Sequence, residues 1–226
     1  MKRETIRRGG RVALIMALSA GLSACTTAMI LMLNQVELTE LTADGDQLYI
    51  MGELNSKSFA QVQTAISEHP EIDTLVFTAM PGSLDDETTF AMGRWLREEG
   101  LNTHLTARSV IASGAVDLYL SGVSRTMEQG AQLGVHSWGY GSKEATDFPK
   151  DDPAHELNKS YIVDLGVPEE FYWFTIHQAP ADAIYWMNED EVARFGLTTE
   201  PISDADRSDD IPFTDFEAKR HDILSD

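Results

Sequence analysis

The chain has 226 residues, of which 42% are hydrophobic and 24% charged, proportions that are ordinary for a soluble globular protein. Its net charge of −20 is unusual, and it argues against nucleic acid as a partner and against docking on anionic lipid. Cys25 is the single cysteine, which excludes an intramolecular disulfide and a cysteine-based zinc site.

Residues 1–24 have the layout of a secretory signal peptide. A basic segment, Lys2 to Arg11, precedes an apolar run from Val12 to Leu22 that is too short for a convincing membrane-spanning helix. These 24 residues hold five basic side chains and one acidic side chain, so the rest of the chain carries a net charge of −24.

The segment ends in Leu22-Ser23-Ala24-Cys25, which resembles the lipoprotein box of bacteria. The resemblance implies cleavage before Cys25 and its lipidation. Acyl chains gain about 0.8 kcal/mol per buried methylene, which holds an acidic domain at a membrane it would not otherwise touch. Thr26 follows instead of an aspartate, and by resemblance to Gram-negative sorting this implies the outer membrane, on its periplasmic face. An uncleaved anchor and a plain signal peptide are the alternatives.

We expect residues 25–45 to be the lipidated cysteine and its tether, residues 46–200 to form one domain, and residues 201–226 to be an acidic tail. Residues 200–226 hold nine acidic and three basic side chains and few apolar ones. This composition predicts a tail that is disordered or loosely packed.

Apolar periodicity and turn residues divide the domain into alternating strands and helices. Strands are predicted over residues 48–51, 74–78, 103–107, 126–127 and 132–135. Helices are predicted over residues 58–68, 86–99, 115–120, 155–165, 168–177 and 190–195, with a polar loop at residues 139–153. This alternation predicts an α/β fold in which helices cover a mainly parallel sheet.

Ser113 stands between small residues at the start of a predicted helix. A serine hydroxyl becomes a nucleophile when a base removes its proton and donors hold the oxyanion that forms. Helix N-termini offer unpaired N–H groups and a field that favours negative charge. The alternative is that Ser113 only caps the helix.

Two further groups fit the same chemistry. Gly82, in Pro81-Gly82-Ser83, follows a buried strand, and ligands collect outside the carboxyl ends of strands in open α/β sheets. His136 follows the short apolar run Leu133 to Val135 and is a candidate base. Their alternatives are an ordinary turn and a structural histidine.

The order and spacing of these groups resemble the Clp proteolytic-subunit and crotonase-like superfamily. Residues 77–83 resemble its oxyanion turn, residues 112–115 its nucleophile turn, and residues 135–137 its base segment. Residues 187–197 are similar to its closing helix, so the resemblance covers about residues 46–200. It implies repeated β-α-β units around a mainly parallel sheet with flanking helices, and assembly into a homo-oligomer.

The resemblance also implies the site residues. Ser113 would be the nucleophile, His136 the general base, and the N–H groups of Gly82 and Gly114 the oxyanion hole. The family turn usually has two glycines, whereas a serine follows Gly82 here. Counting back from the closing helix puts an isoleucine at the family's aspartate position, so Asp182, two residues earlier, is the candidate third triad member. A Ser–His dyad is the alternative.

These residues predict an envelope-anchored serine hydrolase, a peptidase that acts on peptides or unfolded chains without an ATP-driven partner, cofactor or metal. The membrane contact is expected through the lipid anchor only. A catalytically inactive binding or scaffold lipoprotein with the same fold is the second hypothesis. A crotonase-type enzyme acting on acyl thioesters is the third, and a chain of charge −24 offers no basic groove for coenzyme A.

Overall fold

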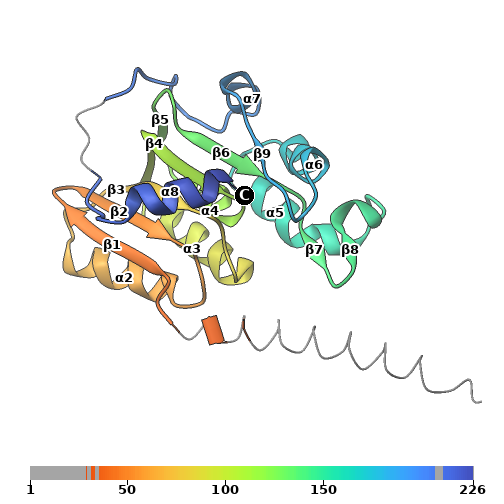
Figure 1. Cartoon of the computed structure of the whole chain (residues 1–226), viewed down its shortest axis with the longest axis horizontal. Helices are drawn as coiled ribbons and strands as arrows, with labels where there is room; N and C mark the ends of the chain where they lie inside the picture. The colour runs from red at the N-terminus through yellow and green to blue at the C-terminus, as the bar shows by residue number, and fades with distance from the viewer. Residues whose placement is uncertain (1–28, 30–31, 34–35, 207–210, 226) are drawn as a thin grey trace, which may run out of the picture.

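The computed structural model describes residues 29, 32–33, 36–206 and 211–225 (Figure 1). The predicted signal peptide, residues 1–24, and the predicted lipidation site, Cys25, lie outside the described residues. Within the described part of the chain, no helix combines the length and the apolar character needed to cross a bilayer.

The chain forms an α/β fold with a seven-stranded sheet, which confirms the predicted fold class. The strands are β1 Thr39–Asp44, β2 Gln47–Gly52, β3 Thr74–Met80, β4 Asn102–Ala112, β5 Arg125–Met127, β6 Gln132–Val135 and β9 Tyr185–Trp186, with a separate hairpin of β7 Gly139–Tyr140 and β8 Lys143–Glu144. The helices are α2 Ser58–Glu68, α3 Asp86–Glu98, α4 Gly114–Tyr119, α5 Glu156–Asp164, α6 Glu169–Gln178, α7 Glu189–Arg194 and α8 Phe216–Ser225, with short 3-10 turns at Ala145–Asp147 and Pro153–His155.

The sheet has the order β1-β2-β3-β4-β6-β9, and β5 pairs with the first half of β4. All pairs from β2 to β6 are parallel, whereas β1 and β9 are antiparallel to their neighbours. Parallel strands end at the same edge, so the residues that follow β3, β4 and β6 come together there. These residues are Gly82, Ser113 and His136.

Both faces of the sheet are covered (Figure 1). The larger core contains Phe77 from β3, Phe90 from α3 and Tyr119 from α4. The smaller core lies under α8, where Phe216 and Ile223 pack with buried side chains of β2, β3 and β4. The central strands are buried on both sides, as expected for a parallel sheet.

The prediction for the acidic tail was wrong, because part of it folds against the sheet. Phe216 and Ile223, seven residues apart, lie on one face of α8, and Ile211 and Phe213 pack on the same core. Four apolar side chains therefore anchor a segment whose average composition is strongly acidic.

The predicted boundary at residue 46 was also wrong. The tether assigned to residues 25–45 includes β1, which forms a hairpin with β2 through a turn in which Gly45 has a φ of 59°. This edge strand is half exposed and carries polar side chains, so apolar periodicity did not reveal it. The two-residue strand β9 was missed as well.

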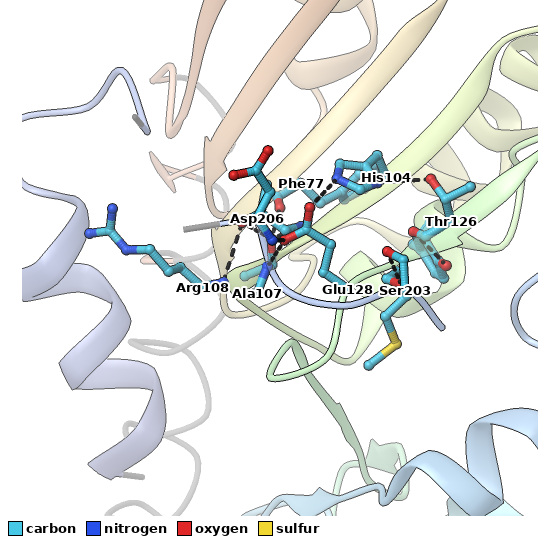
Figure 2. A network of polar contacts seen from close by, with 12 residues as sticks. Phe77, His104, Ala107, Arg108, Thr126, Glu128, Ser203 and Asp206 are labelled. Carbon is cyan, nitrogen blue, oxygen red and sulfur yellow. Dashed lines mark hydrogen bonds and ion pairs between the residues drawn. The ribbon is translucent and has the colours of Figure 1, made fainter. Parts of the chain in front are cut away.

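A buried carboxylate fixes an irregular segment of β4 (Figure 2). The β3–β4 register shifts between Phe77 and Ala79, opposite the segment Thr106–Ser109. The N–H of Ala107 donates to Glu128 Oε2 at 2.9 Å, and the N–H of Asp206 donates to the same oxygen at 3.1 Å. Glu128 thus joins β4 to the segment that leads toward α8.

We expect Glu128→Ala to lower the free energy of unfolding by about 2–4 kcal/mol, because two backbone N–H groups lose a charged acceptor. Glu128 is 6% exposed, so water replaces the carboxylate poorly. Urea denaturation monitored by tryptophan fluorescence measures the effect. The exposed neighbour Gln129 gives the control Gln129→Ala, and equal unfolding midpoints for the two variants would contradict this role of Glu128.

Candidate active site

A pocket opens at the carboxyl ends of β4 and β6. Its walls come from α3, α4, α5 and α6 and from the segment after β6. The lining residues are Asp86, Ser113, Val116, Asp117, Val135, His136, Trp138, Asn158, Ile162, Phe171, Tyr172, Thr175 and Ile176. Apolar and aromatic walls with a few convergent polar groups are typical of small-ligand and catalytic sites.

Ser113 has a backbone conformation that costs free energy. Its φ of 53° is positive, and no other non-glycine residue in the described ranges has a positive φ. Its N–H donates to the carbonyl of Gly134 at 3.0 Å, and its own carbonyl accepts from Val116 N–H at 2.8 Å. The strand β6 and the helix α4 therefore hold Ser113 in a strained turn, a feature that clusters at functional sites.

Ser113 does not act as an ordinary helix cap. It occupies the N-cap position of α4, yet its side chain makes no capping hydrogen bond. Ser113 is instead among the residues that line the pocket. The capping alternative raised by the sequence therefore does not describe this serine.

The turn after β3 packs closely against Ser113. A Cβ added to Gly82, whose φ is 148°, would lie 3.0 Å from Ser113 Cβ and 3.5 Å from its Oγ. A Cβ added to Gly114 would lie 2.5 Å from Ser83 Cβ. Among the described residues, no hydrogen-bond acceptor takes the N–H of Gly82 or Gly114. Two free backbone donors thus flank the serine.

His136 lines the same pocket as Ser113. Its Nδ1 lies 2.6 Å from the carbonyl oxygen of Ser137, which only accepts, so Nδ1 carries the proton and donates. In the neutral ring Nε2 is then unprotonated, which is the form a general base requires. No hydrogen bond joins Ser113 to His136 in the described structure.

The structure does not bring Asp182 to His136. Asp182 is exposed in the turn before β9 and is not among the residues that line the pocket. The carbonyl of Ser137 occupies Nδ1 of His136, the nitrogen that a third triad member would contact. No carboxylate in the described residues forms a hydrogen bond or an ion pair with His136, and the Ser–His dyad stays a prediction.

Two carboxyl groups in the pocket were missed. Burial, reinforced by the charge of Asp86, raises the pKa of Asp117 to about 8. Burial and the charge of Asp85 raise the pKa of Asp86, while His136 and Ser83 lower it. Asp85 is the N-cap of α3 and accepts from Thr88 N–H at 3.0 Å. Of these two neighbouring acidic residues, Asp85 therefore caps α3 and Asp86 lines the pocket.

The aromatic wall is held by directed hydrogen bonds. Trp138 Nε1 donates to the hydroxyl of Tyr172 at 3.0 Å, and that hydroxyl lies 2.6 Å from Nδ1 of His155. His155 is 1% exposed. Burial raises the pKa of Tyr172 to about 12, so the hydroxyl keeps its proton at neutral pH and donates to His155. These contacts fix two side chains of the pocket.

The pocket offers no constellation of metal ligands. Across residues 29, 32–33, 36–206 and 211–225, no three histidine, cysteine, aspartate or glutamate side chains gather closely enough to hold a metal ion. The chemistry available from the described side chains is a hydroxyl, an imidazole and two carboxyls beside free backbone N–H groups.

No family model and no curated protein matches the chain. Solved structures do match. A serine-to-alanine variant of the 1510-N membrane-bound stomatin-specific protease has 13% identity and a TM-score of 0.51, covering 74% of this chain and 83% of that chain. An enoyl-CoA hydratase/isomerase from Marinobacter aquaeolei has 11% identity and a TM-score of 0.50, covering 84% and 75%. The chain therefore has the fold shared by ClpP-like proteases and crotonase-like enzymes.

Proposed function

We propose that the protein is a serine hydrolase, a peptidase that acts on peptides or unfolded chains. The observation that carries this proposal is the strained backbone of Ser113, which presents its hydroxyl to a pocket that also contains His136. A structural serine gains nothing from such a conformation, whereas a nucleophile needs to project from its turn.

The geometry supports a two-step acyl transfer. Ser113 Oγ attacks the substrate carbonyl while His136 Nε2 takes the hydroxyl proton. The N–H groups of Gly82 and Gly114 stabilise the oxyanion, and the proton on His136 passes to the leaving amine. Water attacks the acyl-enzyme, with His136 again as base, and frees the acid and Ser113. Hydrogen bonds at such sites tighten when substrate binds.

Hydrolysis of a dye-labelled, unfolded protein chain tests the proposal. The wild type is expected to release labelled peptides, while Ser113→Ala and His136→Ala each reduce the rate by at least roughly 10³-fold. The double variant is expected to match the single ones, because the two residues act as a unit. Equal release by wild type and Ser113→Ala would end the proposal.

Gly82 offers a separate test of the oxyanion site. In Gly82→Ala the new Cβ presses on Ser113 at 3.0 Å, so we expect the N–H to shift and the rate to fall by about 10²-fold. Gly141 also has a positive φ, 65°, but no atom within 4 Å of an added Cβ. Gly141→Ala is therefore the matched control and is expected to keep the rate, and equal rates for both variants would contradict the assignment of Gly82.

A catalytically inactive binding lipoprotein is the second candidate. The observation that favours it is the lack of a hydrogen bond between Ser113 and His136 among the described residues. The similar solved structures do not decide, since one is a protease and another an enoyl-CoA hydratase/isomerase. The binding protein would keep its fold, resist serine-directed reagents and be unchanged by His136→Ala.

We also propose that Cys25 is lipidated and holds the domain at the periplasmic face of the outer membrane, and that the protein forms a homo-oligomer. Leu22-Ser23-Ala24-Cys25 and Thr26 support the lipid anchor, and the resemblance to the Clp proteolytic-subunit and crotonase-like superfamily supports the assembly. Membrane fractionation tests the anchor: the wild type is expected in the outer membrane, and Cys25→Ala in the soluble fraction. Light scattering of the detergent-solubilised protein tests the assembly, and a monomer would contradict it.

A further inference from the structure

Asp117 lies one helical turn beyond Ser113 at the start of α4. The N–H of Asp117 donates to the carbonyl of Ser113 at 3.3 Å, so the two residues stand at the two ends of this first turn. Both residues line the pocket. A substrate whose carbonyl carbon is at Ser113 Oγ therefore lies in the pocket that Asp117 also lines.

The carboxyl of Asp117 has no partner. The residue is partly exposed and lines the pocket, and among the described residues no cationic side chain lies within ion-pair distance of it. Its backbone carbonyl, not its carboxyl, accepts the hydroxyl of Tyr161 at 3.0 Å. A partly buried carboxylate without a cation or a donor is costly, and a cation entering the pocket reduces that cost.

The nearby cations are engaged elsewhere. Arg94 pairs with Asp164 on the outer side of α5 at 3.2 Å. Arg97 donates to the carbonyl of Gly122 at 3.2 Å. The titratable groups that face Asp117 are Asp86 from α3, which lines the pocket with it, and Tyr161 from α5. His136, after β6, lines the same pocket and acts on Asp86.

The walls suit a long side chain with a charged end. Val116, Ile162 and Ile176 are buried and apolar and match an aliphatic stem. Trp138 and Tyr172 add aromatic rings, whose faces attract an ammonium or guanidinium group. Lysine and arginine side chains combine such a stem with such a head.

We propose that this pocket selects substrates with a lysine or arginine side chain on the acyl side of the scissile bond, with Asp117 as the specificity-determining residue. The proposal rests on the proposed hydrolase function and names its substrate class. The incoming cation supplies the partner that Asp117 lacks, and Asp86, which lines the same pocket, adds attraction.

The selection depends on pH. Because burial raises the pKa of Asp117 to about 8, its carboxyl holds a proton in the free protein at neutral pH. A bound cation favours the ionised carboxylate, so binding releases that proton. The preference for a cationic substrate over a neutral one therefore increases as the pH rises from 6 to 8.

Two diphenyl phosphonate probes of equal length test the proposal, one with a lysine side chain and one with the neutral norleucine side chain. In both, Ser113 Oγ forms a bond to phosphorus, one phenoxide leaves, and His136 relays the hydroxyl proton to it. Labelling rates are measured on the full chain at pH 8. The wild type is expected to react about tenfold faster with the lysine probe, the ratio that a hydrogen bond to a charged group supports.

In Asp117→Asn the lysine-to-norleucine ratio is expected to fall to about one. Asp164→Asn, a carboxyl on the outer side of α5, is the matched control and is expected to keep the wild-type ratio. A wild-type ratio of one or less, or a ratio that survives in Asp117→Asn, overturns the cation proposal while labelling itself upholds the hydrolase. No labelling by either probe or by a small fluorophosphonate overturns both.

Discussion

The Ser113→Gly variant is expected to lose hydrolytic activity while its free energy of unfolding rises. The hydroxyl is the proposed nucleophile, so the rate falls by at least roughly 10³-fold. The φ of 53° is costly for any residue with a Cβ and free for glycine. Strain of this kind costs about 1–3 kcal/mol, and the greater chain entropy of glycine offsets part of the relief. We expect a net gain of about 1 kcal/mol.

Ser113→Ala is the control for this pair of effects. It removes the hydroxyl but keeps the Cβ, so it is expected to be equally inactive with a stability within about 0.5 kcal/mol of the wild type. Urea denaturation and hydrolysis of an unfolded chain measure the two quantities on the same samples. A Ser113→Gly protein less stable than Ser113→Ala would show that the turn is not strained.

The Asp117→Asn variant is expected to be more stable than the wild type above pH 6. The pKa of Asp117 is about 8 in the folded protein and near 3.8 in the unfolded chain. Between these values the folded state holds a proton that the unfolded state has released, so stability falls as the pH rises. The contribution is fully present below pH 4 and lost as the pH passes 8. An asparagine at this position does not titrate, so it adds no such pH dependence to the stability.

Each pH unit of such a shift corresponds to about 1.4 kcal/mol, and the partial exposure of Asp117 reduces the total. We therefore expect Asp117→Asn to be stabilised by on the order of 2–3 kcal/mol at pH 8 and by little at pH 4. Urea denaturation at pH 4, 6 and 8 checks this. Parallel stability curves for the two proteins would show that Asp117 is not buried as a neutral acid. If Asp117→Asn both loses the preference for a cationic probe and gains stability, Asp117 lowers the free energy of unfolding while it selects the substrate.

Local patterns predicted the framework well. The helix over residues 58–68 was predicted with the bounds that α2 has, and the parallel sheet follows from strands that alternate with helices. Gly82 and His136 were predicted after strands and Ser113 at the start of a helix. The strand predicted over residues 103–107 extends to Ala112, so all three residues follow strands of the parallel sheet, whose carboxyl ends lie together. The order of these groups along the chain was informative because residues that follow neighbouring parallel strands lie close together at one edge of the sheet.

The rest depended on contacts between distant segments. Asp117 appears in the sequence as a helical acid, and only the packing of α3, α5 and α6 around α4 encloses it. Asp182 lies exposed in the turn before β9, and no hydrogen bond or ion pair joins it to His136 among the described residues. The helix α8 carries too few apolar residues for periodicity to reveal it. Phe216 and Ile223 are nevertheless enough to hold the helix in place, because they pack against buried side chains of the sheet.

The measurement that tests the central claim most directly is peptide mapping by mass spectrometry after reaction with a fluorophosphonate. We predict one adduct per chain, on the peptide that contains Ser113, and its disappearance when the protein is first unfolded in urea. A folded protein that forms no adduct, or forms it on another residue, would contradict the assignment of Ser113 as the nucleophile.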